Sequence, residues 1–227
     1  MNRRLLTVCG GALNLAILFG PLWWSYGYTP WGRWELAAVS FGLTLFYFAD
    51  CDRSETFNPH HTTAHDRRAI RLAYVMGIGL LITLWGALLE FGGRAQSVAN
   101  WQIGVGGLLM LGGAVLRRLA VRALGSKFVT RITPRADHSF VETGIYAHLR
   151  HPSETAILLM VAGVAITLGS RLGIAALVFG LFPLVVYRLR LEDRQLAVAY
   201  GNRHAAYVDR VNSIVPRLPR LGTSHTG

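Results

Sequence analysis

The sequence predicts an all-α, polytopic integral membrane protein with about six transmembrane helices and a cytoplasmic C-terminal region. Of its 227 residues, 52% are hydrophobic and only 15% are charged, and the mean hydropathy is +0.36. These values are typical of membrane proteins and not of soluble domains. Long apolar runs separated by short polar loops, with the basic residues gathered in the loops, indicate the same class.

Four apolar runs in the N-terminal half are interpreted as membrane helices. The first follows Arg3 and Arg4, and because no small-residue cleavage site comes after it, we interpret it as an uncleaved helix and not as a signal peptide. Tryptophans and tyrosines cluster between the first and second runs, which is typical of a membrane interface. The runs cover about residues 5–24, 34–49, 70–91 and 101–116.

Two further spans are expected in the C-terminal half, at residues 152–168 and 174–187. Pro152 predicts the start of the fifth span, because proline fits the first turn of a helix, where its missing N–H costs nothing. Pro183 is expected to kink the sixth. Residues 188–210 mix charged and apolar side chains, which favours a helix that leaves the membrane and lies partly along its surface.

The formal net charge of +11 is explained by membrane topology. The basic residues fall between apolar runs, where they meet lipid headgroups, so we expect no nucleic-acid partner. With a cytoplasmic N-terminus and six spans, all of the 23 Lys and Arg residues except Arg33, Arg94 and Arg171 lie in cytoplasmic segments. This asymmetry predicts that both termini are cytoplasmic. The expected location is an integral, multi-pass protein of a bacterial inner membrane.

Glycines and histidines in the first half offer weaker signals. Glycines 104, 106, 107, 112 and 113 lack the spacing of a dinucleotide-binding loop, so we interpret them as sites of close helix packing. His61 and His65 have the spacing of helical metal ligands, and His60 stands beside them. Pro59 and the lack of an H-E-x-x-H pattern favour a solvated cytoplasmic loop, and we predict no metal.

Two polar segments in the C-terminal half carry the candidate chemistry. The first reads GIYAHLRHPSE over residues 144–154, and it places Arg150 and His151 just before the positive N-terminus of the fifth span. Such a position favours an anion such as a carboxylate. The second reads RLRLEDRQL over residues 188–196, and Tyr200-Gly201, Tyr207 and VPRLP at residues 215–219 follow it.

As an ordered set, these segments resemble the isoprenylcysteine carboxyl methyltransferase family and the related membrane phospholipid methyltransferases. The resemblance covers residues 127–219. It implies S-adenosyl-L-methionine as cofactor and methyl transfer to a lipophilic acceptor within membrane lipids, such as a prenylated cysteine or a phospholipid. We expect a single membrane domain, residues 1–227. Its parts are N-terminal membrane helices (1–116), a cofactor-binding catalytic region with two membrane helices (117–220) and a tail (221–227).

The resemblance also assigns site residues. It implies that the cofactor is lined by His138, Ser139, Phe140, Val141, Tyr146, His151, Pro152, Ser153 and Glu192. Arg188 falls on the substrate-side arginine, four residues before Glu192 and therefore on the same helix face. The alternative for these two is an ordinary ion pair on a solvated helix.

Two positions depart from the family pattern. Glu154 stands where the family usually has an aromatic residue, and it is a candidate catalytic group that either touches the cofactor or acts as a base for a neutral nucleophile. Arg131 stands near a common glutamine, where it meets either the cofactor carboxylate or a lipid headgroup.

Other functions stay open at this point. A phospholipid or small-molecule N- or S-methyltransferase has the same motifs. A sterol-type reductase that uses NADPH has a similar C-terminal architecture, although this chain offers few groups for a dinucleotide. A non-enzymatic membrane protein such as a transporter would carry polar residues at mid-membrane, and the first four spans have almost none.

Overall fold

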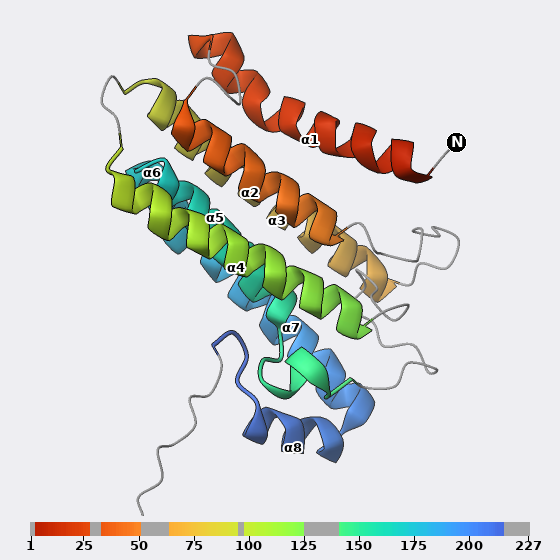
Figure 1. Ribbon diagram of the computed structural model, residues 1–227. Helices are drawn as coiled ribbons and strands as arrows, with labels where there is room; N and C mark the ends of the chain where they lie inside the picture. The colour runs from red at the N-terminus through yellow and green to blue at the C-terminus, as the bar shows by residue number, and fades with distance from the viewer. Residues whose placement is uncertain (1–2, 28–32, 51–63, 95–97, 125–140, 216–227) are drawn as a thin grey trace, which may run out of the picture.

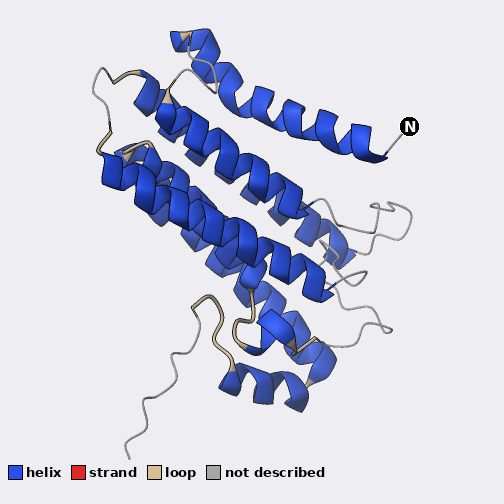
Figure 2. Cartoon of the chain, viewed as in Figure 1, coloured by secondary structure: helices blue, strands red, loops and turns tan. Residues whose placement is uncertain are grey.

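The computed structural model describes residues 3–27, 33–50, 64–94, 98–124 and 141–215. Side chains within these ranges are described except at 3–8, 50 and 64–70. The described residues form helices joined by turns and loops, without a strand (Figure 2). The predicted all-α class is therefore confirmed for this part of the chain.

The helices follow the predicted apolar runs closely. The N-terminal half contains α1 (Arg3–Tyr26), α2 (Trp34–Asp50), α3 (Ala64–Gly92) and α4 (Asn100–Leu124). The C-terminal half contains the 3-10 turn η3 (Gly144–Ala147), α5 (Pro152–Thr167), α6 (Arg171–Ala176), the π-helical turn η4 (Leu177–Leu181), α7 (Phe182–Tyr200) and α8 (Asn202–Arg210). As predicted, α5 begins at Pro152.

Three helical segments of the described chain are long and apolar enough to cross a membrane. They are Arg71–Gly92, Asn100–Leu124 and Arg171–Tyr200. The apolar helices α2 and α5 have 17 and 16 residues, or about 25 Å at 1.5 Å per residue, which is shorter than a hydrocarbon core of about 30 Å. The membrane class is thus supported, whereas the number of six spans stays a prediction.

The helix around Pro183 is continuous but departs from α geometry. Residues 171–200 run through α6, η4 and α7 without a break. Pro183 has no N–H to donate to the preceding turn, and the π-helical turn at Leu177–Leu181 lies immediately before α7. Where a kink was predicted at Pro183, the structure has a π-helical turn just before the proline. Below it, α7 continues to Tyr200 and ends at Gly201, whose φ of +48° favours glycine.

Among the helices that the structure describes, α4 and α5 share the most extensive interface. A Cβ atom at Gly113 would lie 2.8 Å from the carbonyl oxygen of Ala156, and one at Gly106 would lie 2.6 Å from that of Gly163. Close helix packing is thus confirmed at these two glycines. At glycines 104, 107 and 112 a Cβ would meet nothing within 4 Å, so they do not contribute to this interface.

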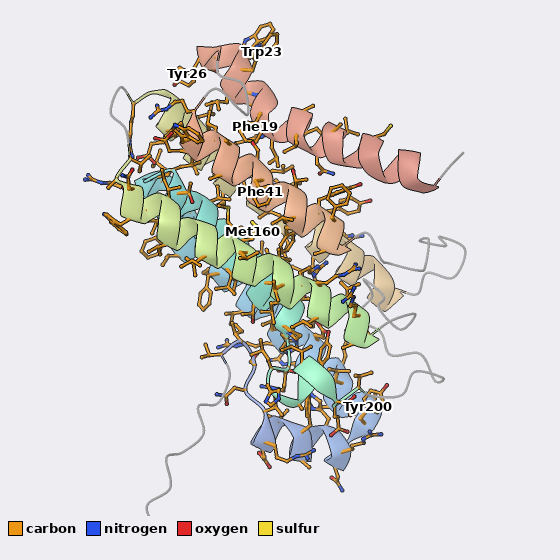
Figure 3. All side chains as sticks on the ribbon, viewed as in Figure 1. Phe19, Trp23, Tyr26, Phe41, Met160 and Tyr200 are labelled. Carbon is orange, nitrogen blue, oxygen red and sulfur yellow. The ribbon has the colours of Figure 1, made fainter. Side chains whose placement is uncertain are left out.

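The buried apolar side chains of the described residues form two clusters. One cluster of buried apolar side chains joins α1 to α5, and Met160 of α5 lies within it (Figure 3). A second cluster, with Val161, Val185 and Leu189, joins α5 to η4 and α7. Figure 1 shows that α7 extends beyond the end of α4 and there carries α8, so that η3, the start of α5, the end of α7 and α8 meet at one end of the molecule.

Candidate active site

Asp193 of α7 is the centre of a charged cluster at this end of the molecule. Arg150 donates from Nη1 to Asp193 Oδ2 over 3.0 Å, and His151 donates from Nε2 to Asp193 Oδ1 over 3.2 Å. His204 of α8 places its Nε2 3.6 Å from the same Oδ1. Both histidines are buried. The side chains of Arg150 and His151 are thus paired with a carboxylate of the protein itself, and the anion site predicted at the N-terminus of α5 stays a prediction.

Backbone bonds hold the C-terminal segment against the start of α5. The N–H groups of Arg150 and His151 donate to the carbonyls of Asn212 and Ser213, each over 3.0 Å. Thr155 Oγ1 lies 3.0 Å from the carbonyl oxygen of Ile214. These contacts fix the polar turn before α5, which otherwise has no helix or sheet to satisfy its backbone groups.

Tyr207 ties α8 to η3. Its buried hydroxyl donates to the carbonyl oxygen of Tyr146 over 2.6 Å. Burial raises the pKa of Tyr207 to about 12, against the opposing positive charge of Arg150. Tyr146 is also buried, and its pKa is raised first by burial and then by the negative charges of Glu154 and Glu192. Tyr146 therefore lies close to both carboxylates.

The first turn of α5 has donors that no group in the described chain uses. His151 is the N-cap residue and makes no side-chain capping bond, and Pro152 follows at the first helical position. Ser153 is buried, and its Oγ has no hydrogen-bond partner. A buried hydroxyl without a partner is costly, and at a helix N-terminus it can donate to an anion along with the free backbone N–H groups.

Arg188 forms an ion pair with Glu154, across from α7 to α5. The distance from Arg188 Nη2 to Glu154 Oε1 is 3.7 Å, and the two side chains are 16% and 11% exposed. Nη1 of Arg188 points at the sulfur of Met76, 3.8 Å away, and its Nε is buried without a partner. The arginine thus keeps donors that no oxygen of the described chain accepts.

Glu192 lies in the electrostatic field of these groups, with His151, Glu154, Arg188 and Asp193 around it. Its side chain is half-buried, and within the described chain it makes no hydrogen bond and no ion pair. The predicted alternative, an Arg188–Glu192 ion pair, is not formed, because Arg188 pairs with Glu154. Glu192 is instead a carboxylate available to a ligand.

His151 is a buried histidine whose pKa is raised by its neighbours. Burial lowers the pKa of its imidazole, but the hydrogen bond to Asp193 and the negative charges of Glu192 and Glu154 outweigh burial and raise the pKa above its ordinary value. When protonated, this imidazolium adds to the positive potential at the N-terminus of α5.

Most of the predicted site residues that can be placed lie near one another. Tyr146, His151, Pro152, Ser153, Glu154, Arg188 and Glu192 surround the start of α5. Val141 is half-buried, just before η3. His138, Ser139, Phe140 and Arg131 lie outside the described residues, as do His60, His61 and the side chain of His65.

Sequence reasoning missed three contributors: Asp193, His204 and Tyr207. Asp193 and Tyr207 are part of the quoted motifs, but the order of the motifs does not reveal that Asp193 pairs with Arg150 and His151 or that Tyr207 bonds to Tyr146.

A cavity of about 280 Å³ opens beside the cluster around Asp193. It is lined by Arg150, Val186, Leu189, Arg190, Asp193, Ser213 and Ile214.

Fold and site together define a helical membrane protein with a charged site at one end of its helix bundle. The model of the isoprenylcysteine carboxyl methyltransferase (ICMT) family matches residues 106–198. The resemblance predicted from the motifs is thus confirmed, and the match begins upstream of residue 127, within α4, and ends before residue 219.

Curated proteins named as protein-S-isoprenylcysteine O-methyltransferases are similar to this chain over a longer range. A probable protein-S-isoprenylcysteine O-methyltransferase of Oryza sativa subsp. indica is 29% identical over 188 residues, 81% of this chain and 95% of the relative. The Schizosaccharomyces pombe enzyme is 24% identical over 233 residues, 94% of this chain and 95% of its own. The Saccharomyces cerevisiae enzyme is 26% identical over 114 residues, 49% of this chain and 48% of its own.

Proposed function

We propose that this protein is an integral membrane methyltransferase that uses S-adenosyl-L-methionine to methylate the carboxyl group of a prenylated cysteine. The observation that carries the proposal is the convergence of Arg188 and Glu192 on the N-terminus of α5, within the residues that match the family model. The relatives described above are named for O-methylation of isoprenylcysteine, which supports a carboxyl acceptor over the phospholipid, small-molecule, reductase and non-enzymatic alternatives.

The residues at the site fit the cofactor's functional groups. Glu192, half-buried and without a partner, suits the cofactor's ammonium group or its ribose hydroxyls. The unpartnered hydroxyl of Ser153 and the free N–H groups of α5 suit its carboxylate. Tyr146 and Val141 offer apolar surface for the adenine. When bound, S-adenosylmethionine supplies a methyl group made electrophilic by its sulfonium.

Arg188 is proposed to hold the acceptor carboxylate. Its planar fork matches a carboxylate bidentately, and its Nε and Nη1 have no oxygen acceptor in the described chain. Glu154, 3.7 Å from Nη2, orients the guanidinium. With the cofactor bound, an oxygen of the acceptor carboxylate would take the methyl group from the sulfonium, and a methyl ester and S-adenosylhomocysteine would result. Because a carboxylate is already deprotonated, this transfer needs no base, and positioning and exclusion of water supply the catalysis.

The orientation in the membrane is also proposed. Six spans with both termini in the cytoplasm would place the start of α5 and the end of α7 at the cytoplasmic surface, where a soluble cofactor has access. The distribution of Lys and Arg supports this orientation. The relatives described above come from a plant and two fungi, so they give no support to a bacterial inner membrane.

Isothermal titration of the purified protein in detergent tests the cofactor assignment. We expect S-adenosylhomocysteine to bind and reduced nicotinamide adenine dinucleotide phosphate not to bind. Binding of the dinucleotide in place of S-adenosylhomocysteine would contradict the proposal and favour a reductase. As a control, Glu142→Gln changes a carboxylate that pairs with the exposed Arg203 and Arg210, and it should leave the affinity unchanged.

A further inference from the structure

A second cavity lies at the opposite end of the bundle from the candidate active site. It has a volume of about 720 Å³ and is lined by residues from the end of α3, the start of α4 and the passage from α5 to α6. Figure 1 shows these segments at the end of the bundle away from α8. Arg94, Arg171 and Gln102 supply polar groups to its wall, and Phe91, Ile166 and Ile174 supply apolar ones. Because α5, with 16 residues, separates the two ends by about 24 Å, this cavity plays no part in the proposed methyl transfer.

At this end of the molecule, arginines outnumber carboxylates by one. The helix ends and the loops between them carry five acidic or basic side chains: Arg33, Glu35, Glu90, Arg94 and Arg171. Three positive and two negative charges leave a net charge of +1.

Two of the arginines form ion pairs with carboxylates. Arg33 Nη2 lies 3.1 Å from Glu35 Oε1, and Arg94 forms an ion pair with Glu90. Glu90 also accepts from the backbone N–H of Leu172 over 2.8 Å, which fixes the start of α6. The guanidinium of Arg171 has no carboxylate partner in the described chain, and it is exposed at the rim of the cavity. The excess positive charge at the cavity is therefore that of Arg171.

Gln102 places a second donor beside this cation. Its Oε1 accepts from the backbone N–H of Ala99 over 3.1 Å, so the amide is oriented with Nε2 as the free group. Nε2 lies next to Gly169, whose φ of +58° forms the turn between α5 and α6. Trp101, 64% exposed, stands on the same rim, as tryptophan does at the level of lipid headgroups.

We propose that this cavity binds the phosphate of an anionic phospholipid in the leaflet opposite the candidate active site. An anionic phospholipid such as phosphatidylglycerol has a net charge of −1, which complements the net charge of +1, whereas the choline of phosphatidylcholine cancels the charge of its phosphodiester. Arg171 and the amide of Gln102 would donate to its oxygens, while the apolar wall and the exposed Trp101 and Leu172 would meet the glycerol and the acyl chains. Free phosphate shares the headgroup chemistry but gains nothing from the apolar wall.

Native mass spectrometry of the full-length protein in detergent, with phosphatidylglycerol and phosphatidylcholine of identical acyl chains, tests this proposal. We expect the wild type to retain phosphatidylglycerol in preference to phosphatidylcholine. Arg171→Gln should lower that retention about fivefold, the equivalent of about 1 kcal/mol for one arginine near a lipid surface. Gln102→Glu keeps the acceptor for Ala99 and places a negative charge beside the phosphate, so it should lower retention as well.

Arg122→Gln is the matched control. Arg122 is an exposed arginine in the last turn of α4, at the other end of the bundle, and its exchange should leave the retention unchanged. Equal retention of both lipids by the wild type would overturn the proposal, and so would wild-type selectivity in both the Arg171 and Gln102 variants. Displacement of phosphatidylglycerol by millimolar inorganic phosphate would show a site for a soluble anion and would overturn the assignment to a lipid.

Discussion

Exchanging Asp193 for asparagine removes the negative charge around which Arg150, His151 and His204 gather. The two hydrogen bonds from Arg150 and His151 span 3.0 and 3.2 Å and are charge-assisted, and such bonds contribute about 1.5–3 kcal/mol each. The side chain of Asp193 is 25% exposed, so solvent weakens them somewhat. Asparagine keeps the shape and one acceptor oxygen. We therefore expect the free energy of unfolding to fall by about 2–4 kcal/mol.

The loss should depend on pH, through His151. Because the folded protein raises the pKa of this imidazole, the charged histidine adds stability that is fully present below its unfolded pKa of about 6.5. That stability disappears as the pH rises through the raised value in the folded state. The difference between wild type and Asp193→Asn should therefore be larger at pH 6 than at pH 9.

Unfolding in mixed micelles of increasing dodecyl sulfate content, followed by tryptophan fluorescence, measures the difference. Glu142→Gln is the matched control, because Glu142 also pairs with two arginines, Arg203 and Arg210, but these are 58% and 66% exposed. Exposed pairs contribute less than about 1 kcal/mol. If Asp193→Asn destabilised the protein no more than this control, the cluster around Asp193 would not hold α7 and α8 to α5.

Three further changes test other parts of the account. Glu192→Gln should weaken S-adenosylhomocysteine binding in titration calorimetry by about 1.5–3 kcal/mol. It should leave the free energy of unfolding unchanged, since Glu192 makes no hydrogen bond and no ion pair in the described chain. Unchanged affinity would remove Glu192 from the cofactor site. Gly113→Ala should lower the free energy of unfolding in the micelle assay by about 1–3 kcal/mol, because its Cβ would press on the carbonyl of Ala156. Gly112→Ala is the control, because its Cβ would meet nothing within 4 Å. Equal effects would contradict the packing of α4 on α5. A reporter fused after Arg220 should be active only in the cytoplasm, and activity on the outside would reverse the proposed orientation.

The helices were predictable because lipid-facing and core-facing residues are both apolar. The run at residues 34–49 became α2 at Trp34–Asp50, and the fifth helix begins at Pro152 as proline chemistry requires. The path near Pro183 was less predictable. A missing N–H favours a local break, but whether a chain bends, stops or inserts a π turn depends on how its neighbours pack.

The partners of the charged residues could be predicted least. Helical spacing pairs Arg188 with Glu192, but the fold brings Glu154 of α5 within 3.7 Å of the arginine, and Glu192 forms no ion pair within the described chain. The motif likewise indicates an anion beside His151 without identifying Asp193 as that anion. Both outcomes depend on how α7 is rotated against α5. The apolar side chains of the second core cluster, which include Val161 of α5 and Leu189 of α7, determine that rotation. A linear motif has no information on that rotation.

Steady-state methylation by wild type, Arg188→Lys and Glu154→Gln tests the central claim most directly, with a prenylated cysteine analogue and a phosphatidylethanolamine as acceptors. The account predicts that the wild type methylates the prenylated cysteine. Arg188→Lys should lower kcat/KM for it by about tenfold or more while S-adenosylhomocysteine affinity stays constant, because lysine lacks the bidentate fork. Full activity of Arg188→Lys, or methylation of phosphatidylethanolamine alone with its loss in Glu154→Gln, would contradict a carboxylate held by Arg188.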